Sequence, residues 1–255
     1  MVQEEKHRFA LSSFRADMIS QSQINELKTQ WQTTELNIAR EYVQSILLSG
    51  LYSHPEVNLA FKGGTALRLL RRSPRFSEDL DFTGWGKPYH VGEWIKASVK
   101  ESGNAGLEFE TLESNPTSGG WFASVRTHVH QWPVEIEWNV SLRGQKKPDT
   151  ETVLVTTPLW PAYSVKALSQ DTMIEEKLSA ALSRKEPRDF YDLYFILRDR
   201  LSVKVLIPKK KEIIQALKSL EPRRLKNELN SFLPRSHRAI IAQLPHLLRR
   251  ELERL

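Results

Sequence analysis

The spacing of apolar residues divides the chain into helical and strand-like stretches. Between residues 21 and 51, apolar side chains recur at intervals of three and four, which predicts one or two amphipathic helices. Residues 133–142 alternate instead between apolar and polar side chains, which is typical of a strand with one buried face. Weaker alternation predicts further strands over residues 107–112, 121–129 and 152–156.

Residues 57–84 show a pattern of strand, glycine turn, short helix, loop and second strand. Gly63 and Gly64 interrupt the first apolar run, Thr65 is suited to cap the helix that follows, and Pro74 ends that helix. A glycine-led helix therefore separates the two strands.

After Pro158 and Pro161 the alternation stops and helical periodicity returns. We expect an α+β fold that divides near residues 157–170 into two lobes. The first, residues 1–160, holds strands and helices, and the second, residues 161–255, is mainly helical. The remaining helices are expected at residues 90–102, 172–184, 188–198, 209–220, 223–232 and 236–255.

Composition excludes several classes of protein. The 255 residues include no cysteine, so disulfides, thiolate metal sites and thiol nucleophiles are ruled out. The 40% apolar and 27% charged residues are typical of a globular protein. No apolar run approaches the roughly 18 residues of a membrane span, and the N-terminus lacks the pattern of a signal peptide. We therefore expect a cytoplasmic protein without a membrane partner.

The net charge of +6 is unevenly distributed along the chain. Residues 198–255 contain 15 Lys and Arg against 6 Asp and Glu, a net charge of +9, which leaves −3 for the rest. A polyanionic partner is therefore expected to contact mainly the C-terminal part.

Asp79 and Asp81 carry the strongest chemical signal. In a strand, alternation places both carboxylates on one face, while Leu80 and Phe82 point to the other face and the core. Two neighbouring carboxylates repel each other, so a bound cation makes the arrangement favourable. Mg²⁺, or Mn²⁺, prefers such oxygen ligands together with substrate phosphates. On its own, an Asp-x-Asp pair is more often two solvated surface acids.

The glycine turn upstream changes that interpretation. Gly63, Gly64 and Thr65 lead into a helix whose first N–H groups and positive dipole end suit the phosphates of a nucleotide. Thirteen residues, 66–78, separate this turn from Asp79. The combination supplies a phosphate site and a metal site together, which neither motif does alone.

At this point the sequence resembles the AbiEii/MenT family of bacterial nucleotidyltransferase toxins. The resemblance covers roughly residues 57–198. It implies a nucleotidyltransferase-like mixed β-sheet and an enzyme that moves a nucleotide from an NTP onto RNA, typically a tRNA 3′ end. It also implies a type IV toxin–antitoxin pair with a cognate antitoxin and a toxin that blocks translation and growth. The motifs that carry it are KGGTALR at 62–68, RFSEDLDF at 75–82, EKL at 176–178 and RDFYDL at 188–193.

The resemblance also implies roles for individual residues. Asp79 and Asp81 would hold Mg²⁺, and Ser77 would lie beside the triphosphate with the glycine turn. Lys177 matches a helical lysine expected to bind nucleotide phosphate. Asp192 matches the acid expected to position or deprotonate the acceptor, with Asp189 as the less certain choice. A salt-bridged, solvated helix face is the alternative for the last three.

A third carboxylate is normally needed in this superfamily to complete the site. Glu135 and Glu137 are the candidates because both lie on one face of the expected strand 133–142, and Glu137 is preferred. Arg68 and Arg75 flank the motif and are suited to stabilise a leaving pyrophosphate.

Two other functions fit the same residues. The same catalytic core could transfer the nucleotide to a protein or a small molecule. Alternatively, the chain could be a non-catalytic module whose basic helices bind RNA or a protein partner. The NTP and the acceptor stay open.

Overall fold

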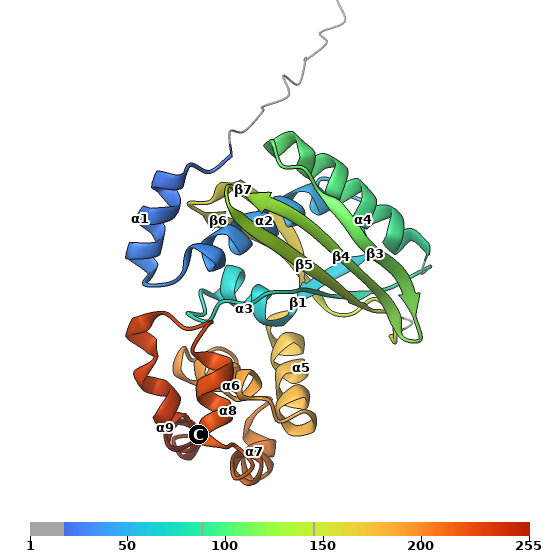
Figure 1. Cartoon of the computed structure of the whole chain (residues 1–255). Helices are drawn as coiled ribbons and strands as arrows, with labels where there is room; N and C mark the ends of the chain where they lie inside the picture. The colour runs from blue at the N-terminus through green and yellow to red at the C-terminus, as the bar shows by residue number, and fades with distance from the viewer. Residues whose placement is uncertain (1–17, 88, 145) are drawn as a thin grey trace, which may run out of the picture.

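The computed structural model describes residues 18–87, 89–144 and 146–255, which form one seven-stranded mixed sheet (Figure 1). The strand order is β3-β4-β5-β2-β1-β7-β6, with β2 parallel to β5 and β1 parallel to β7. The remaining neighbours are antiparallel. The strands are β1 Leu59–Lys62, β2 Leu80–Gly84, β3 Glu110–Thr117, β4 Gly120–Val129, β5 Trp132–Ser141, β6 Thr150–Thr157 and β7 Trp160–Leu168.

Helices α2 and α4 cover one side of the sheet, and the C-terminal helices form a separate helical layer (Figure 1). The central helix α2 packs against β5, β7 and α4. The C-terminal helices gather together beyond α3, on the far side from α4 (Figure 1). The helices are α1 Gln21–Trp31, α2 Glu35–Tyr52, α3 Gly63–Arg71, α4 Tyr89–Ser102, α5 Gln170–Ser183, α6 Pro187–Arg198, α7 Lys210–Leu217, α8 Pro222–Leu229 and α9 Ala239–Glu253.

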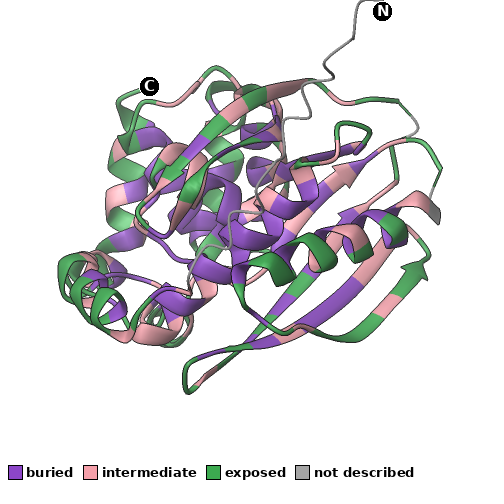
Figure 2. Cartoon of the chain, turned by 90° about the horizontal axis from the view of Figure 1, so that it is seen from above, coloured by how far each residue is buried: buried purple, intermediate pink, exposed green. Residues whose placement is uncertain are grey.

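The core lies between α2 and the sheet, where Figure 2 shows buried residues concentrated. Helix α2 starts at Thr34, whose side chain accepts a hydrogen bond from the backbone N–H of Asn37. Most of its side chains are buried because it contacts the sheet on one side and α4 on the other. No helix in the described part of the chain is long and apolar enough to cross a membrane.

The expected α+β architecture with a mixed sheet is confirmed, with differences in the bounds of several elements and one additional strand. Strand β3 begins three residues later than expected, at Glu110. Strand β7 was not expected, because Pro158 and Pro161 read as the end of strand structure. The structure accommodates Pro161 where the pairing of β6 with β7 is irregular, between Val155 and Thr157. The sheet thus continues to Leu168.

The strand register places four residues in one row across the sheet. Lys62 on β1 lies opposite Asp81 on β2, Asp81 opposite Asn139 on β5, and Asn139 opposite Phe122 on β4. Directly opposite residues carry their side chains on the same face. This face is the one that α2 does not cover. The alternate residues of β2, Leu80 and Phe82, are buried on the opposite face.

We expect Phe82→Ala to destabilise the protein by about 3–5 kcal/mol. The Phe82 ring is fully buried, stacks on Trp138 with the centroids 5.4 Å apart and lies 5.7 Å from the Phe61 ring. Urea unfolding measures the change. The control Leu154→Ala, at a side chain 62% exposed on β6, should stay within about 0.5 kcal/mol. Equal losses in the two variants would contradict this description of the core.

Candidate active site

The glycine turn at the start of α3 brings backbone unusually close to the acidic strand. Gly63 has φ +83°, and a Cβ there would lie 2.1 Å from Oδ2 of Asp81. A Cβ on Gly64 would lie 2.5 Å from Nη2 of Arg75 and 2.6 Å from Oγ of Ser77. Only glycines therefore allow the helix to start between these groups. No described side chain caps this helix, so its first N–H groups can bind an anion.

Two buried side chains hold the segment ahead of the acids. Thr65 lies inside α3 and does not cap it as the sequence predicted; its hydroxyl donates instead to the carbonyl of Asp79 at 2.6 Å and so supports the start of β2. Gln44 on α2 donates to the carbonyls of Ser77, at 3.0 Å, and Glu78, at 2.8 Å. The sequence did not identify Gln44 as a site residue. Its one signal is a long polar side chain between the apolar pairs Tyr42–Val43 and Ile46–Leu47 of α2.

Asp79 and Asp81 lie half-buried on the uncovered face of the sheet, as alternation predicts. Burial raises the pKa of Asp79 to about 6, with further contributions from the negative charges of Asp81 and Glu137. Burial also raises the pKa of Asp81, against the opposing charges of Lys177 and Lys62. A divalent cation between these carboxylates would relieve both the repulsion and the cost of burial.

The structure separates the two candidates for a third carboxylate. Glu137 lies close enough to Asp79 to raise its pKa. Glu135 instead accepts hydrogen bonds from Ser124 at 2.8 Å and from Arg126 at 3.1 Å, and these bonds lower its pKa. Across the described ranges, no three acidic or histidine side chains are close enough to hold one metal ion together. A metal on the two aspartates would take its other ligands from substrate or water.

The two aspartates and the glycine turn lie in a cleft of about 740 Å³ between the sheet face and helices α5 and α6. Gly64, Ser77 and both aspartates line it. Basic side chains outnumber acidic ones in the lining, so the cleft suits a bound polyanion. The basic side chains are Lys62, Arg75, Arg143, Lys177, Arg184 and Arg188, and the acidic ones are Asp79, Asp81 and Asp189.

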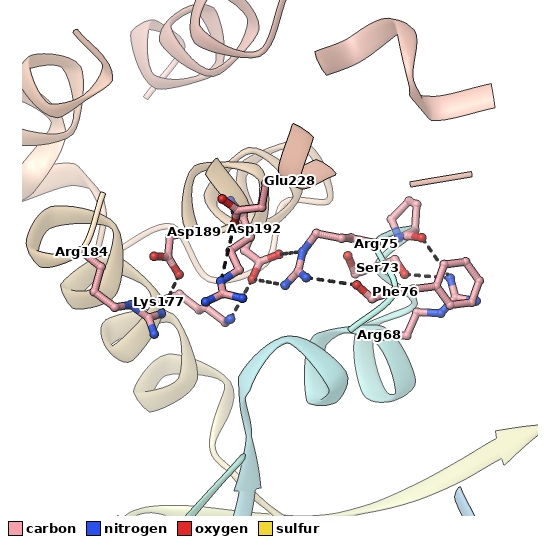
Figure 3. Close-up of polar contacts among 11 residues, drawn as sticks. Arg68, Ser73, Arg75, Phe76, Lys177, Arg184, Asp189, Asp192 and Glu228 are labelled. Carbon is pink, nitrogen blue, oxygen red and sulfur yellow. Dashed lines mark hydrogen bonds and ion pairs between the residues drawn. The ribbon is translucent and has the colours of Figure 1, made fainter. Parts of the chain in front are cut away.

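A buried ion triad forms the back of the cleft (Figure 3). Arg75 donates through Nε and Nη2 to the two carboxylate oxygens of Asp192, at 2.8 and 2.9 Å. Lys177 donates to Oδ2 of the same residue at 2.7 Å. Burial alone would raise the pKa of Asp192, but the two cations outweigh burial and hold it at about 2. Both oxygens of Asp192 are thus occupied by two cations that line the cleft, and the carboxylate positions those cations.

Asp189, rather than Asp192, faces the cleft. One of its oxygens accepts a hydrogen bond from Arg184 at 2.8 Å, and the other, Oδ2, is buried without a partner among the described residues. Nε of Arg188 lies 3.6 Å from Oε1 of Glu228 of α8. The arrangement reverses the order in which the sequence ranked the two aspartates for contact with substrate.

Arg68 lies outside the cleft, contrary to its expected place beside the phosphates. Its Nε donates to Glu41 at 2.8 Å, and its Nη1 donates to the carbonyls of Ser73 and Pro74, at 3.1 and 3.3 Å. The guanidinium also lies 3.9 Å from the centre of the Phe76 ring (Figure 3). Arg68 thus shapes the loop that carries Arg75 instead of lining the site.

We expect Asp192→Asn to destabilise the protein by about 3–5 kcal/mol, because it leaves two buried cations uncompensated. The matched control Asp189→Asn should cost less, since its one cation, Arg184, is 54% exposed and can reach water. Urea unfolding at pH 7 compares the two variants. An equal loss in both would contradict the central place of the triad.

The triad also predicts a pH dependence. The pKa of Asp192 lies near 2 when folded and near 3.9 when unfolded, so its stabilisation is complete above about pH 4. It is lost as the pH falls from about 4 towards 2. The unfolding midpoint in urea should decline less steeply over this interval in Asp192→Asn than in the parent. Parallel declines in the two proteins would contradict the lowered pKa.

Comparison with solved structures agrees with the geometry. MenT4, a nucleotidyltransferase toxin from Mycobacterium tuberculosis H37Rv, matches with a TM-score of 0.65 and 16% identity, over 93% of this chain and 90% of that one. JHP933 from Helicobacter pylori matches with a TM-score of 0.53 and 18% identity, over 87% and 95%. At these identities the likeness shows the fold. No curated protein sequence matches.

Comparison with family models covers most of the chain. Residues 46–250 match the model for the nucleotidyl transferase AbiEii toxin of type IV toxin–antitoxin systems. This match confirms the resemblance that the motifs around Gly63 and Asp79 indicate. The chain therefore belongs to the AbiEii family of nucleotidyltransferase toxins.

Proposed function

We propose that this nucleotidyltransferase uses Mg²⁺ to transfer a nucleotide from an NTP to an RNA acceptor. The acceptor we propose is the 3′ end of a tRNA. One observation carries the proposal: two carboxylates at the start of β2 lie beside an uncapped, glycine-led helix start in a cleft rich in cations. Acids suit a metal, and cations and free N–H groups suit a triphosphate. An NTP with its metal satisfies all of them at once.

The residues present fit a divalent metal. Asp79 and Asp81 provide oxygen ligands whose pKa values are raised mainly by burial, a cost that a bound cation would offset. Mg²⁺ fits this donor set best, and Mn²⁺ would serve as well. When bound, the metal would offset the negative charge that develops around the α-phosphorus.

The chain's own groups hold the triphosphate. The N–H groups behind Gly63 and Gly64, together with the Ser77 hydroxyl, face the phosphates, and Arg75 and Lys177 neutralise them. An acceptor hydroxyl oxygen then forms a bond to the α-phosphorus. The bond from that phosphorus to the α,β-bridging oxygen breaks, and pyrophosphate leaves with the electron pair. The positioning of the triphosphate relative to this hydroxyl is the main contribution of the fold.

The hydroxyl proton needs an acceptor other than Asp192. Glu137 is our candidate base, since it lies beside Asp79 on the neighbouring strand and is exposed to the cleft side of the sheet. Asp189 lines the cleft, has one buried oxygen without a partner among the described residues, and is assigned to orienting the acceptor. Asp192 acts through Arg75 and Lys177.

The C-terminal helices support RNA as the acceptor. Arg184 and Arg188 line the cleft at the end of α5 and the start of α6. Beyond them, exposed lysines continue onto a groove between α5 and α7 that contains Lys185, Lys211 and Lys218. Consecutive cations at the mouth of an active site suit a nucleic-acid backbone better than a protein or small molecule.

As a type IV toxin, the protein has an antitoxin partner. We place its action in the cytoplasm, where modification of tRNA would block translation and growth. Toxicity should then require the same carboxylates as nucleotide transfer.

Asp81→Ala should abolish incorporation of α-³²P-labelled nucleotide into RNA. The protein is incubated with each labelled NTP in turn, Mg²⁺ and total RNA, and labelled 3′ ends are sequenced. The control Asp149→Ala, at an exposed acid outside the cleft, should keep full activity. Unchanged incorporation by Asp81→Ala would contradict the assignment of the site. Label found only in protein or in small molecules would favour the alternative acceptors.

Asp79→Asn separates an enzyme from a binding module. If Asp79 holds the metal, NTP binding should require Mg²⁺ in the parent and weaken at least tenfold in the variant. Titration calorimetry with and without EDTA measures both effects. RNA binding, assigned to the C-terminal helices, should stay unchanged and serves as the internal control. Metal-independent NTP binding that survives in Asp79→Asn would rule out the metal site.

A further inference from the structure

Phe122 is an apolar side chain that the core does not use. It lies on β4 and lines the cleft, half-buried, on the same sheet face as Asp81. It belongs neither to the buried core nor to the partly buried apolar residues packed on that core. Within the described ranges, its ring forms no aromatic pair of the kind that Phe82 forms with Trp138. The ring is therefore available to a ligand.

The other two aromatic residues of the lining differ from Phe122. Phe82 is fully buried, with its ring on the opposite face of the sheet. Trp121 points to that opposite face as well, where its ring lies against Gly92 of α4 and its Nε1 donates to Ser114 at 3.0 Å. Among the described lining residues, Phe122 alone presents an aromatic face to the cleft.

The position of Phe122 relative to Asp81 matches the shape of a nucleotide. Phe122 lies opposite Asn139, and Asn139 lies opposite Asp81, so two strand spacings, about 10 Å, separate the backbones of Phe122 and Asp81. The phosphate-binding groups lie on the other side of Asp81, at the glycine turn. A triphosphate at that turn would place the sugar near Asn139 and the base over Phe122.

We propose that Phe122 is the stacking platform for the base of the incoming NTP, an inference that rests on the proposed function. Aromatic stacking accepts any base because every base has a π face. Phe122 thus sets the affinity for a nucleoside triphosphate over a bare polyphosphate and leaves the choice of base to polar neighbours.

Two polar neighbours are placed for that choice. Asn139 lies between the acid and the ring and has both a donor and an acceptor. Arg143 lines the same end of the cleft against the turn between β3 and β4, where a Cβ on Gly119 would come within 2.8 Å of its Nε. The hydrogen bond from the N–H of Leu142 to the carbonyl of Gly119, at 2.8 Å, fixes that turn.

The acceptor base is a less suitable occupant of the ring. The exposed cations of α5, α6 and α7 lead RNA to the cleft from the helical layer. Phe122 lies on the strand β4, two strands beyond β2 and Asp81 in the sheet order. A nucleotide lying along the row from Lys62 to Phe122 leaves the helical side open for the acceptor.

The test compares ligands with and without a base. Titration calorimetry measures the Kd of the four ribonucleoside α,β-methylene triphosphates with Mg²⁺, which the transfer step cannot cleave, and the Kd of tripolyphosphate. Phe122→Ala should weaken all four analogues roughly tenfold and leave tripolyphosphate binding unchanged. Phe122→Leu should weaken them similarly, because it keeps apolar bulk without a π face, and Phe122→Tyr should bind like the parent.

Matched controls keep the result interpretable. Leu154→Ala removes an exposed apolar side chain from the far edge of the same sheet and should change no Kd. Unchanged analogue binding in Phe122→Ala overturns the inference, as does an equal loss of tripolyphosphate binding. A raised KM for RNA with unchanged NTP binding would assign the ring to the acceptor and also overturn it. Failure of the parent protein to bind any analogue would overturn the proposed function itself.

Discussion

The buried carboxylate of Asp192 is the interaction on which the site depends. A charge with 1% exposure persists only if cations compensate it, and Arg75 and Lys177 supply them from two different segments. Arg75 belongs to the loop ahead of β2, and Lys177 belongs to α5. The anion therefore joins the helical layer to the acidic strand at the cleft. Because the same two cations line the cleft, one interaction supports both folding and anion binding.

A second electrostatic constraint complements the first. On the sheet face, Asp79 and Asp81 carry negative charge that burial makes unfavourable. Opposite them, the cations of the cleft exceed the acids. Neither set neutralises the other fully, since the basic groups are tied to Asp192, Asp189 and Glu176. In the function we propose, a metal with a triphosphate would bring a positive and a negative charge into the cleft together and so complete the electrostatic balance that the chain leaves open.

The fold was predictable where the pattern is local. Helical periodicity identified the helices, and the alternation over 133–142 identified β5 because each depends on near neighbours in sequence. Strand β7 was missed since Pro161 looks like a breaker in isolation. Pro161 is tolerated because it lies where the pairing of β6 with β7 is irregular, and that irregularity is a feature of the sheet that the local sequence does not show. The boundary expected after residue 160 stays a prediction, although the sheet extends to Leu168.

The difference between local patterns and contacts of distant residues also explains which site residues could be predicted. Asp79 and Asp81 share a face because they are two residues apart, and Gly63 faces Asp81 because β1 pairs directly with β2. Arg68 and Arg75 look equivalent in the sequence, yet partners far away in sequence separate them: Glu41 draws Arg68 to the loop, and Asp192 draws Arg75 to the cleft. The shared face of the two aspartates is thus encoded locally, whereas the placement of cations depends on which distant carboxylate is buried beside each one.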